Sequence, residues 1–108
     1  MNRSKIKITI VKCMDTKEIF GDDRSAETSE NFLTKCSLFH EGQIIIIDEK
    51  GNIPEGFCSW AWPDIHREIT LLRLGGNYPE MKNGGSMYVS CSDGLRPVIF
   101  KLERMKKK

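Results

Sequence analysis

Hydrophobic and polar residues alternate along several stretches of the chain, and this period of two is typical of half-buried β-strands. The alternation covers residues 5–13, 87–91 and 96–103. Pro97 is expected near the start of its strand, where a missing N–H is tolerated. The isoleucine run at 44–47 has no polar face. It therefore predicts a central strand covered on both sides.

Apolar residues recur at helical spacing between residues 65 and 72, which predicts a main helix over about residues 64–74. Asp64 is expected to cap its start, with Pro63 just outside, and the glycine pair at 75–76 to end it. Four strands and one main helix indicate an α+β fold. We expect a small antiparallel sheet or partial β-barrel with this helix packed on it.

The length of 108 residues predicts a single domain over residues 1–108. Residues 14–35 break the pattern with polar and turn-forming residues, which predicts a mobile loop or a short helix, with residues 28–35 as the helical candidate. Residues 105–108 form a basic tail.

Charge is unevenly distributed, because the net charge of +2 divides into +4 at each end of the chain and −6 between. Paired basic ends attract phosphate backbones, but the acidic middle and the lack of an aromatic recognition motif disfavour nucleic acid. No apolar run approaches the roughly 20 residues that span a bilayer. The start of the chain does not resemble a signal peptide. We therefore expect a cytoplasmic protein that makes no membrane contact, and an exposed edge strand would allow a homodimer.

Cysteines at the ends of predicted strands, and one just before the predicted helix, suggest a metal site. Cys36, Cys58 and Cys91 come from separate segments that can converge, and His40 or His66 could supply a fourth ligand. Such a set suits zinc or iron. The spacing matches no ligand knuckle, however, and free cysteines are often simply small buried hydrophobic residues. Both interpretations stay open.

A second hypothesis is a catalytic thiol. Cys58 precedes the predicted helix, where backbone N–H groups favour a thiolate, and His66 could act as its base. The alternative is a cysteine packed between Phe57 and Trp60. Whether the protein is an enzyme stays uncertain.

A third hypothesis is a small-molecule pocket. Trp60 and Trp62 would face the same side of an extended chain, and Arg96 could bind an anionic or flat ligand beside them. Alternatively, the tryptophans plug the open end of the sheet and Arg96 only pairs with Asp93.

Three segments carry a resemblance: CSLFHEGQ at 36–43, GFCSWAW at 56–62 and CSDGLRPVIFKLER at 91–104. Together they resemble a family of small bacterial and archaeal proteins that pairs a GFCxWAW segment with a C-terminal DGxRPVxFKLER segment. The match extends over most of the chain from Cys36 onward. The family has no established activity, so the resemblance brings no substrate or cofactor.

The resemblance does imply that Cys36, Cys58 and Cys91 belong to a recurring pattern, whereas Cys13 and the two histidines fall outside it. The sequence thus favours a small cytosolic binding domain with a cysteine-rich metal site. The alternatives are an enzyme or enzyme subunit that presents Cys58 beside a Trp- and Arg-lined pocket, and a purely structural or interaction module.

Overall fold

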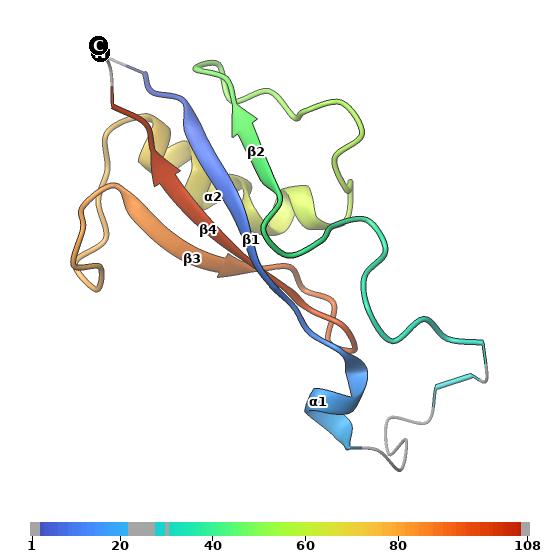
Figure 1. The fold of residues 1–108 in the computed structure, drawn as a ribbon. Helices are drawn as coiled ribbons and strands as arrows, with labels where there is room; N and C mark the ends of the chain where they lie inside the picture. Colours follow the sequence, from blue (N-terminus) through green and yellow to red (C-terminus); the bar gives the residue numbers. More distant parts are fainter. Residues whose placement is uncertain (1–2, 22–27, 30, 107–108) are drawn as a thin grey trace.

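A computed structural model describes residues 3–21, 28–29 and 31–106. Its elements are β1 (Ile6–Cys13), α1 (Thr16–Phe20), β2 (Ile44–Ile47), α2 (Ala61–Arg73), β3 (Ser86–Ser90) and β4 (Val98–Arg104). The strands form one antiparallel sheet in the order β2-β1-β4-β3, and α2 lies across one of its faces (Figure 1). The predicted α+β fold is confirmed, with an open sheet and one main helix.

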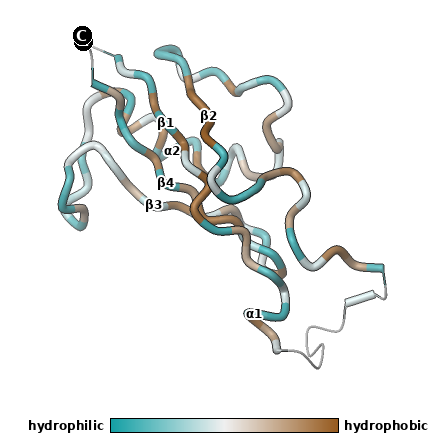
Figure 2. The backbone as a smooth tube through the Cα atoms, in the orientation of Figure 1, coloured by the Kyte–Doolittle hydropathy of each residue, from teal (hydrophilic) through white to brown (hydrophobic). Residues whose placement is uncertain are grey.

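The core lies between α2 and the inner face of the sheet. Figure 2 shows that the hydrophobic stretches gather on the strands and the hydrophilic ones on the connecting loops. Ile6, Ile8 and Ile10 of β1 face the helix, as their alternation predicts, and Ile65 and Ile69 of α2 face the sheet. Fully burying side chains of this size stabilises a fold by about 1.5–3 kcal/mol each.

A β-bulge in β1 changes which residues face the helix. The register with β4 shifts between Ile10 and Lys12, so Val11 is the extra residue and is largely exposed. A one-residue insertion reverses the alternation beyond it. Cys13 therefore points inward and is buried, although strict alternation from Ile10 would place it on the outer face.

The prediction that the isoleucine run is a central strand is wrong. β2 pairs only with β1 and lies at one edge of the sheet. Ile44 and Ile46 lie opposite Thr9 and Lys7 on the outer face, where 57% and 45% of their surfaces are exposed. A continuous apolar run does not by itself distinguish a covered strand from an edge strand.

The N-terminus of α2 also differs from the prediction, because the helix begins at Ala61. Pro63 is its third residue and lies in the first turn, where a proline is tolerated because no intrahelical donor is lost. The Asp64 carboxylate does not cap the helix but accepts the Ser92 N–H at 2.8 Å. This bond ties α2 to the loop between β3 and β4.

The C-terminus of α2 agrees with the prediction. Gly75 adopts a left-handed conformation with φ of 96°. Its N–H donates to the Leu72 carbonyl, and the Gly76 N–H donates to the Leu71 carbonyl. This is the hydrogen-bond pattern of a Schellman motif, which ends a helix where glycine can take positive φ.

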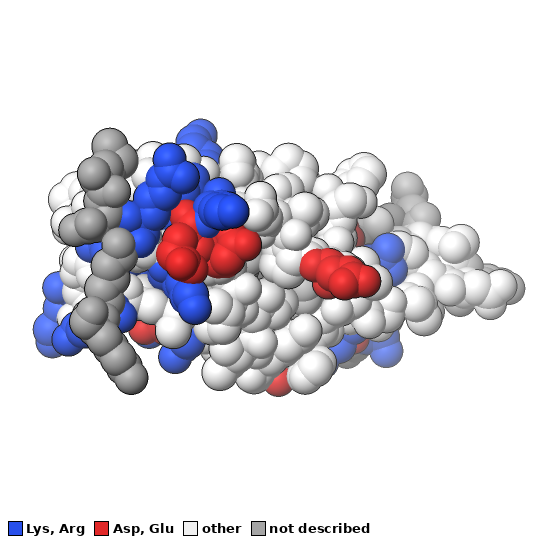
Figure 3. Space-filling model, turned by 90° about the horizontal axis from the view of Figure 1, so that it is seen from above, with Lys and Arg blue, Asp and Glu red and all other residues white. Residues whose placement is uncertain are grey.

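The paired ends of the chain carry charges of both signs. β1 and β4 pair along most of their length, and Lys7 forms an ion pair with Glu103 at 3.9 Å. At the end of the sheet where β1 begins and β4 ends, acidic side chains lie among the basic ones (Figure 3). This mixture of charges gives no support to a phosphate-binding surface on the face seen there.

Part of the segment 14–35 is helical. α1 begins after Asp15, whose carboxylate accepts the Lys17 N–H while the Glu18 side chain accepts the Asp15 N–H, a capping box. In the candidate stretch 28–35, residues 28–29 and 31–35 form no helix. Residues 22–27 and 30, and residues 107–108 of the basic tail, lie outside the described part. Neither described helix has the length and apolarity needed to cross a bilayer.

Candidate functional site

A pocket of about 600 Å³ opens beside the N-terminus of α2, and all three cysteines singled out in the sequence line it. Cys36 comes from the segment before β2, Cys58 from the turn before α2, and Cys91 from the residue after β3. The remaining lining residues are Leu33, Ser37, Leu38, Phe39, Trp60, Ala61, Ser92, Asp93, Gly94, Leu95, Arg96 and Val98. The fold therefore brings together three sulfur atoms that are far apart along the chain.

Each of these sulfurs accepts a backbone N–H. The Leu38 N–H donates to the Cys36 Sγ at 3.4 Å, the Ala61 N–H to the Cys58 Sγ at 3.4 Å, and the Val98 N–H to the Cys91 Sγ at 3.3 Å. A thiol sulfur is only a weak acceptor. N–H donors of this kind stabilise sulfur more strongly when it carries negative charge, as a metal-bound thiolate does.

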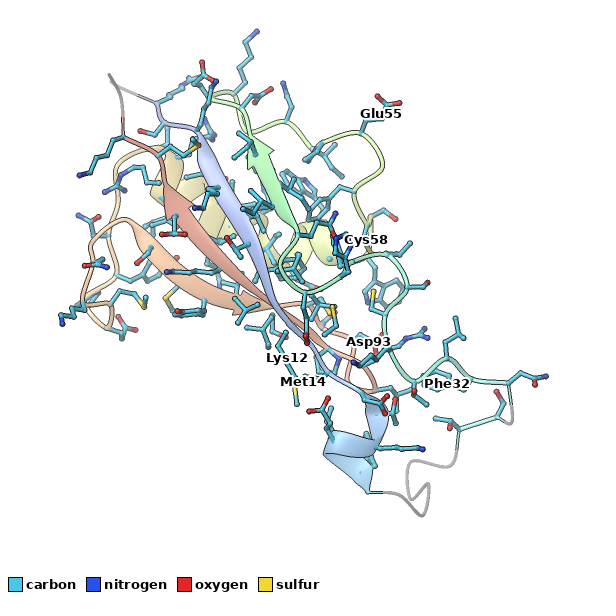
Figure 4. All side chains as sticks on the ribbon, viewed as in Figure 1. Lys12, Met14, Phe32, Glu55, Cys58 and Asp93 are labelled. Atoms are coloured by element: carbon cyan, nitrogen blue, oxygen red, sulfur yellow. The ribbon has the colours of Figure 1, made fainter. Side chains whose placement is uncertain are left out.

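Cys58 lies three residues before the first residue of α2 and bonds to its first turn. Its carbonyl accepts the Trp62 N–H at 3.1 Å, while its sulfur accepts the Ala61 N–H. The N-cap position itself is Trp60, which makes no side-chain cap bond. Trp60, the residue before α2, already has helical dihedral angles, so the helical conformation extends back toward Cys58. The sulfur consequently lies at the positive end of the helix dipole, beside the pocket (Figure 4).

The fourth cysteine, Cys13, lies behind the pocket. Its Sγ donates to the Phe39 carbonyl at 3.6 Å, and Phe39 lines the cavity. Burial raises the pKa of the Cys13 thiol, and the neighbouring Cys36 and Glu41 raise it further. Cys13 is therefore a neutral, inward-facing thiol close to the site. This inward position could not be predicted from the alternation, because the β-bulge is not visible in the pattern.

Arg96 lies in the pocket wall and is held in place by three contacts. Its Nε donates to the Asp93 carboxylate at 3.1 Å and its Nη1 to the Leu33 carbonyl at 2.9 Å. The guanidinium also lies over the Phe32 ring, 4.6 Å from the ring centre, in a cation–π contact. Asp93 and Phe32 lie on the same flank of the molecule (Figure 4). The predicted pairing of Arg96 with Asp93 is present, and Arg96 lines the pocket at the same time.

Two opposing effects act on the Asp93 carboxyl. Burial alone would raise its pKa, but hydrogen bonds from the Leu95 N–H and from Arg96 outweigh that effect and lower the pKa below its ordinary value. Asp93 is therefore a carboxylate at neutral pH, and its charge is largely balanced by Arg96.

The two tryptophans do not face the same side, because the chain is helical rather than extended at this point. Trp60 lines the pocket and remains 71% exposed. Trp62 instead packs against Phe57, with ring centres 5.5 Å apart, and against His66. Only Trp60 and Arg96 of the predicted ligand-binding residues contribute to the cavity.

Neither histidine lies in the pocket wall. His40 is exposed in the turn before β2, and His66 is exposed on α2. Cys58 precedes α2 and lines the pocket, whereas His66 is the sixth residue of the helix and packs against Trp62 outside the pocket wall. The proposed Cys–His pair stays a prediction.

Within residues 3–21, 28–29 and 31–106, no three side chains of His, Cys, Asp or Glu lie close enough together to hold a metal ion. The three pocket cysteines thus surround a shared cavity without converging on one point. Comparison of the chain with protein-family models, curated proteins and solved structures finds no match. The family resemblance of the cysteine-containing segments stays a prediction.

Proposed function

We propose that the protein is a small cytosolic binding domain whose pocket holds zinc or iron through Cys36, Cys58 and Cys91. The observation that carries this proposal is that three sulfurs from three segments line one cavity and each accepts a backbone N–H. Thiolates are the preferred ligands of soft metal ions. A reducing compartment such as the cytosol would keep these thiols available.

The fourth ligand in this proposal is a water molecule or a small molecule in the cavity. Three protein ligands with one open position are typical of metal sites that act on a bound molecule. Because the sulfurs surround the cavity, metal binding would draw their segments together. Cys36 lies in an irregular segment outside the helices and strands, which can shift at lower cost than the sheet.

The test is to purify the full chain without chelator or immobilised nickel and to measure zinc and iron by mass spectrometry. We expect a nearly stoichiometric amount of metal in the unmodified protein. Cys36→Ser, Cys58→Ser and Cys91→Ser should each lose most of it. Cys13→Ala is the matched control, since Cys13 does not line the pocket, and it should retain the metal. Metal-free protein that binds neither ion on titration would contradict the proposal.

A second candidate is an enzyme in which Cys58 is the nucleophile. The observation that favours it is the position of the Cys58 sulfur at the positive end of α2, facing a cavity that Trp60 and Arg96 also line. His66 does not serve as base in this version. Native-state thiol labelling separates the candidates: Cys58 labelling many times faster than Cys36 and Cys91, in protein that binds no metal, supports the enzyme.

Self-association through β2 is a separate proposal about assembly. Ile44 and Ile46 are exposed on an edge strand. Pairing with the β2 strand of a second copy would satisfy its free backbone groups and bring these side chains beside those of the second strand. Sedimentation velocity should then show a dimer for the unmodified chain and a monomer for Ile46→Lys. A monomer at high protein concentration for both would contradict the proposal.

A further inference from the structure

We propose that the cavity beside α2 binds a small aromatic carboxylate, with Arg96 holding the carboxylate and the apolar wall holding the ring. Binding of this ligand goes beyond the proposed function and does not depend on it, because no metal takes part and the three pocket thiols stay protonated. The ligand is held without a covalent bond.

The cavity has the size and the lining of a small-molecule site. Its volume of about 600 Å³ lies within the range of about 300–1,000 Å³ that is usual for such sites. Phe39, Ala61 and Val98 form part of its wall and belong to the buried core. A cavity with mostly apolar sides and few polar groups suits a ligand whose larger part is apolar.

Apolar side chains are also exposed around this cavity. Leu33, Leu38 and Trp60 all line it, and all three are mostly accessible to solvent. Exposed apolar residues that gather in one place mark binding sites, whereas scattered ones need no explanation. The indole of Trp60 and the ring of Phe39 offer flat faces, and aromatic rings gain from packing against one another. These walls therefore favour a ring over a flexible chain.

Arg96 is fixed in position before any ligand arrives. Its Nε donates to Asp93, its Nη1 donates to the Leu33 carbonyl, and the guanidinium lies over the Phe32 ring. The side chain is nevertheless 32% exposed, and in the part of the chain that the structure describes its Nη2 has no hydrogen-bond partner. A guanidinium held in this way loses little freedom on binding, and its fork of N–H groups matches a carboxylate.

The remaining polar groups of the cavity also favour a ligand that brings acceptors. One Asp93 oxygen already accepts the backbone N–H groups of Leu95 and Arg96, and the other accepts the Arg96 Nε–H. The three pocket sulfurs each accept a backbone N–H, which leaves their S–H groups as weak donors. The acceptor is thus occupied while donors remain, and a carboxylate fits this balance better than an amine.

The first experiment titrates the full chain with naphthoate, in the presence of a chelator and a thiol reductant, and follows the two indole N–H signals by nuclear magnetic resonance. The Trp60 signal should shift until it saturates. The Trp62 signal should stay in place, because Trp62 packs against Phe57 and His66 instead of lining the cavity. No saturable shift at millimolar naphthoate would overturn the proposal.

Two further ligands test the two halves of the assignment. Naphthalenemethanol has the same ring but no charge, and it should bind at least about tenfold more weakly than naphthoate. Octanoate has the carboxylate but no ring, and it should also bind more weakly. Equal affinity of the alcohol would overturn the role of the carboxylate, and equal affinity of octanoate would overturn the preference for a ring.

Isothermal titration calorimetry on variants then locates the carboxylate. Arg96→Gln should weaken naphthoate by about 10- to 100-fold and leave naphthalenemethanol nearly unchanged. Arg67→Gln is the matched control, since the Arg67 side chain is 88% exposed on α2 and does not line the cavity. A loss in Arg96→Gln that is equal for both ligands would show that Arg96 only shapes the cavity, and would overturn its contact with the carboxylate.

Metal binding, measured on separate samples, distinguishes failure of this proposal from failure of the proposed function. Cys58→Ser should lose the metal but keep naphthoate, because its hydroxyl still donates, whereas Arg96→Gln should do the reverse. Naphthoate binding by a chain that takes up no metal would support the carboxylate site alone. Naphthoate binding that is lost in Cys58→Ser as fully as in Arg96→Gln would overturn the assignment to Arg96.

Discussion

The two ends of α2 are built on different principles. At the C-terminus, the last four carbonyls of the helix accept N–H groups from Leu74, Gly76, Gly75 and Ser4. The Arg104 guanidinium adds bonds to the Leu72 and Gly76 carbonyls at 3.0 and 2.7 Å. At the N-terminus, the N-cap residue Trp60 makes no side-chain cap bond, and the first turn is bonded by the carbonyl and the weakly accepting sulfur of Cys58, beside an open cavity.

This difference separates a strongly bonded end of the helix from an end that lies beside the pocket. Helix ends leave backbone groups that need partners, and a strongly bonded end anchors the helix. At the C-terminal end, each of the last four carbonyls accepts a backbone N–H, and the Leu72 carbonyl accepts a second bond from Arg104. The N-terminal end uses a poor acceptor where a serine or aspartate side chain would accept more strongly, which is expected if the sulfur has a second role. We therefore expect substitutions at the two ends to affect different measurements.

The largest effect is expected at the C-terminal end. Arg104→Ala removes two hydrogen bonds to carbonyls and one to the Asn77 side chain. Because charged donors to partly buried acceptors are lost, we expect the free energy of unfolding to fall by about 2–4 kcal/mol. Denaturant unfolding measures this change. The control Lys82→Ala, at an exposed position, should be nearly neutral. If Arg104→Ala is equally neutral, the C-terminal end is not the anchor.

The second prediction compares a glycine beside Arg104, at the C-terminal end of α2, with a glycine in the pocket wall beside the N-terminal end. Gly85 has φ of 83°, and an added Cβ would lie 2.9 Å from the Arg104 Nη2. Gly85→Ala should therefore cost about 1–3 kcal/mol in the free energy of unfolding. Gly94 lines the pocket and has open space where a Cβ would stand, so Gly94→Ala should leave stability almost unchanged. Equal thermal shifts for the two variants would contradict the comparison.

The third prediction concerns pH and the pocket wall. The pKa of Asp93 is lowered in the folded state, so its carboxylate stabilises the fold above its unfolded pKa of about 3.9. That contribution is lost as the pH falls through the lower folded pKa. Asp93→Asn should be destabilised by about 1 kcal/mol at neutral pH. The gap from the unmodified protein should close below about pH 4 in denaturant titrations. A gap that is constant with pH would show that the charge plays no part.

The smallest effect on stability is expected at Cys58. Without metal, Cys58→Ala should cost only about 0.5 kcal/mol, because a weak bond from the Ala61 N–H to sulfur is lost, and Cys58→Ser should cost less because its hydroxyl can still accept this N–H. With metal, only the unmodified protein should gain thermal stability, because a ligand that binds the folded state raises the melting temperature. A metal-dependent rise that survives in Cys58→Ser would contradict the role of this sulfur.

The fold was largely predictable because its signals are local. The alternation in β1 and β4, the apolar stripe of α2 and the glycine stop after it all correspond to observed elements. The errors arise where the structure depends on contacts between residues that are far apart in the sequence or on details of backbone geometry. The edge position of β2 depends on strand order, and the early start of α2 depends on the bond from the Ala61 N–H to the Cys58 sulfur and on a proline that fits the first turn.

The site was predictable only in part, for the same reason. Positions at element ends suggested that Cys36, Cys58 and Cys91 could meet, and the structure places them around one pocket without converging on one point. Trp62 was misassigned because its direction depends on whether the chain is helical or extended. The inward position of Cys13 depends on the bulge at Val11, a register shift between paired strands that no single stretch of sequence reveals.

The most direct test of the account is native-state alkylation of the four cysteines, followed residue by residue by mass spectrometry, before and after loading with zinc or iron. The account predicts that Cys36, Cys58 and Cys91 react in the unloaded protein and become protected together on loading. Cys13, which is buried and has a raised pKa, should react slowly in both states. Three pocket thiols that keep their separate rates after loading would contradict the claim that they form one site.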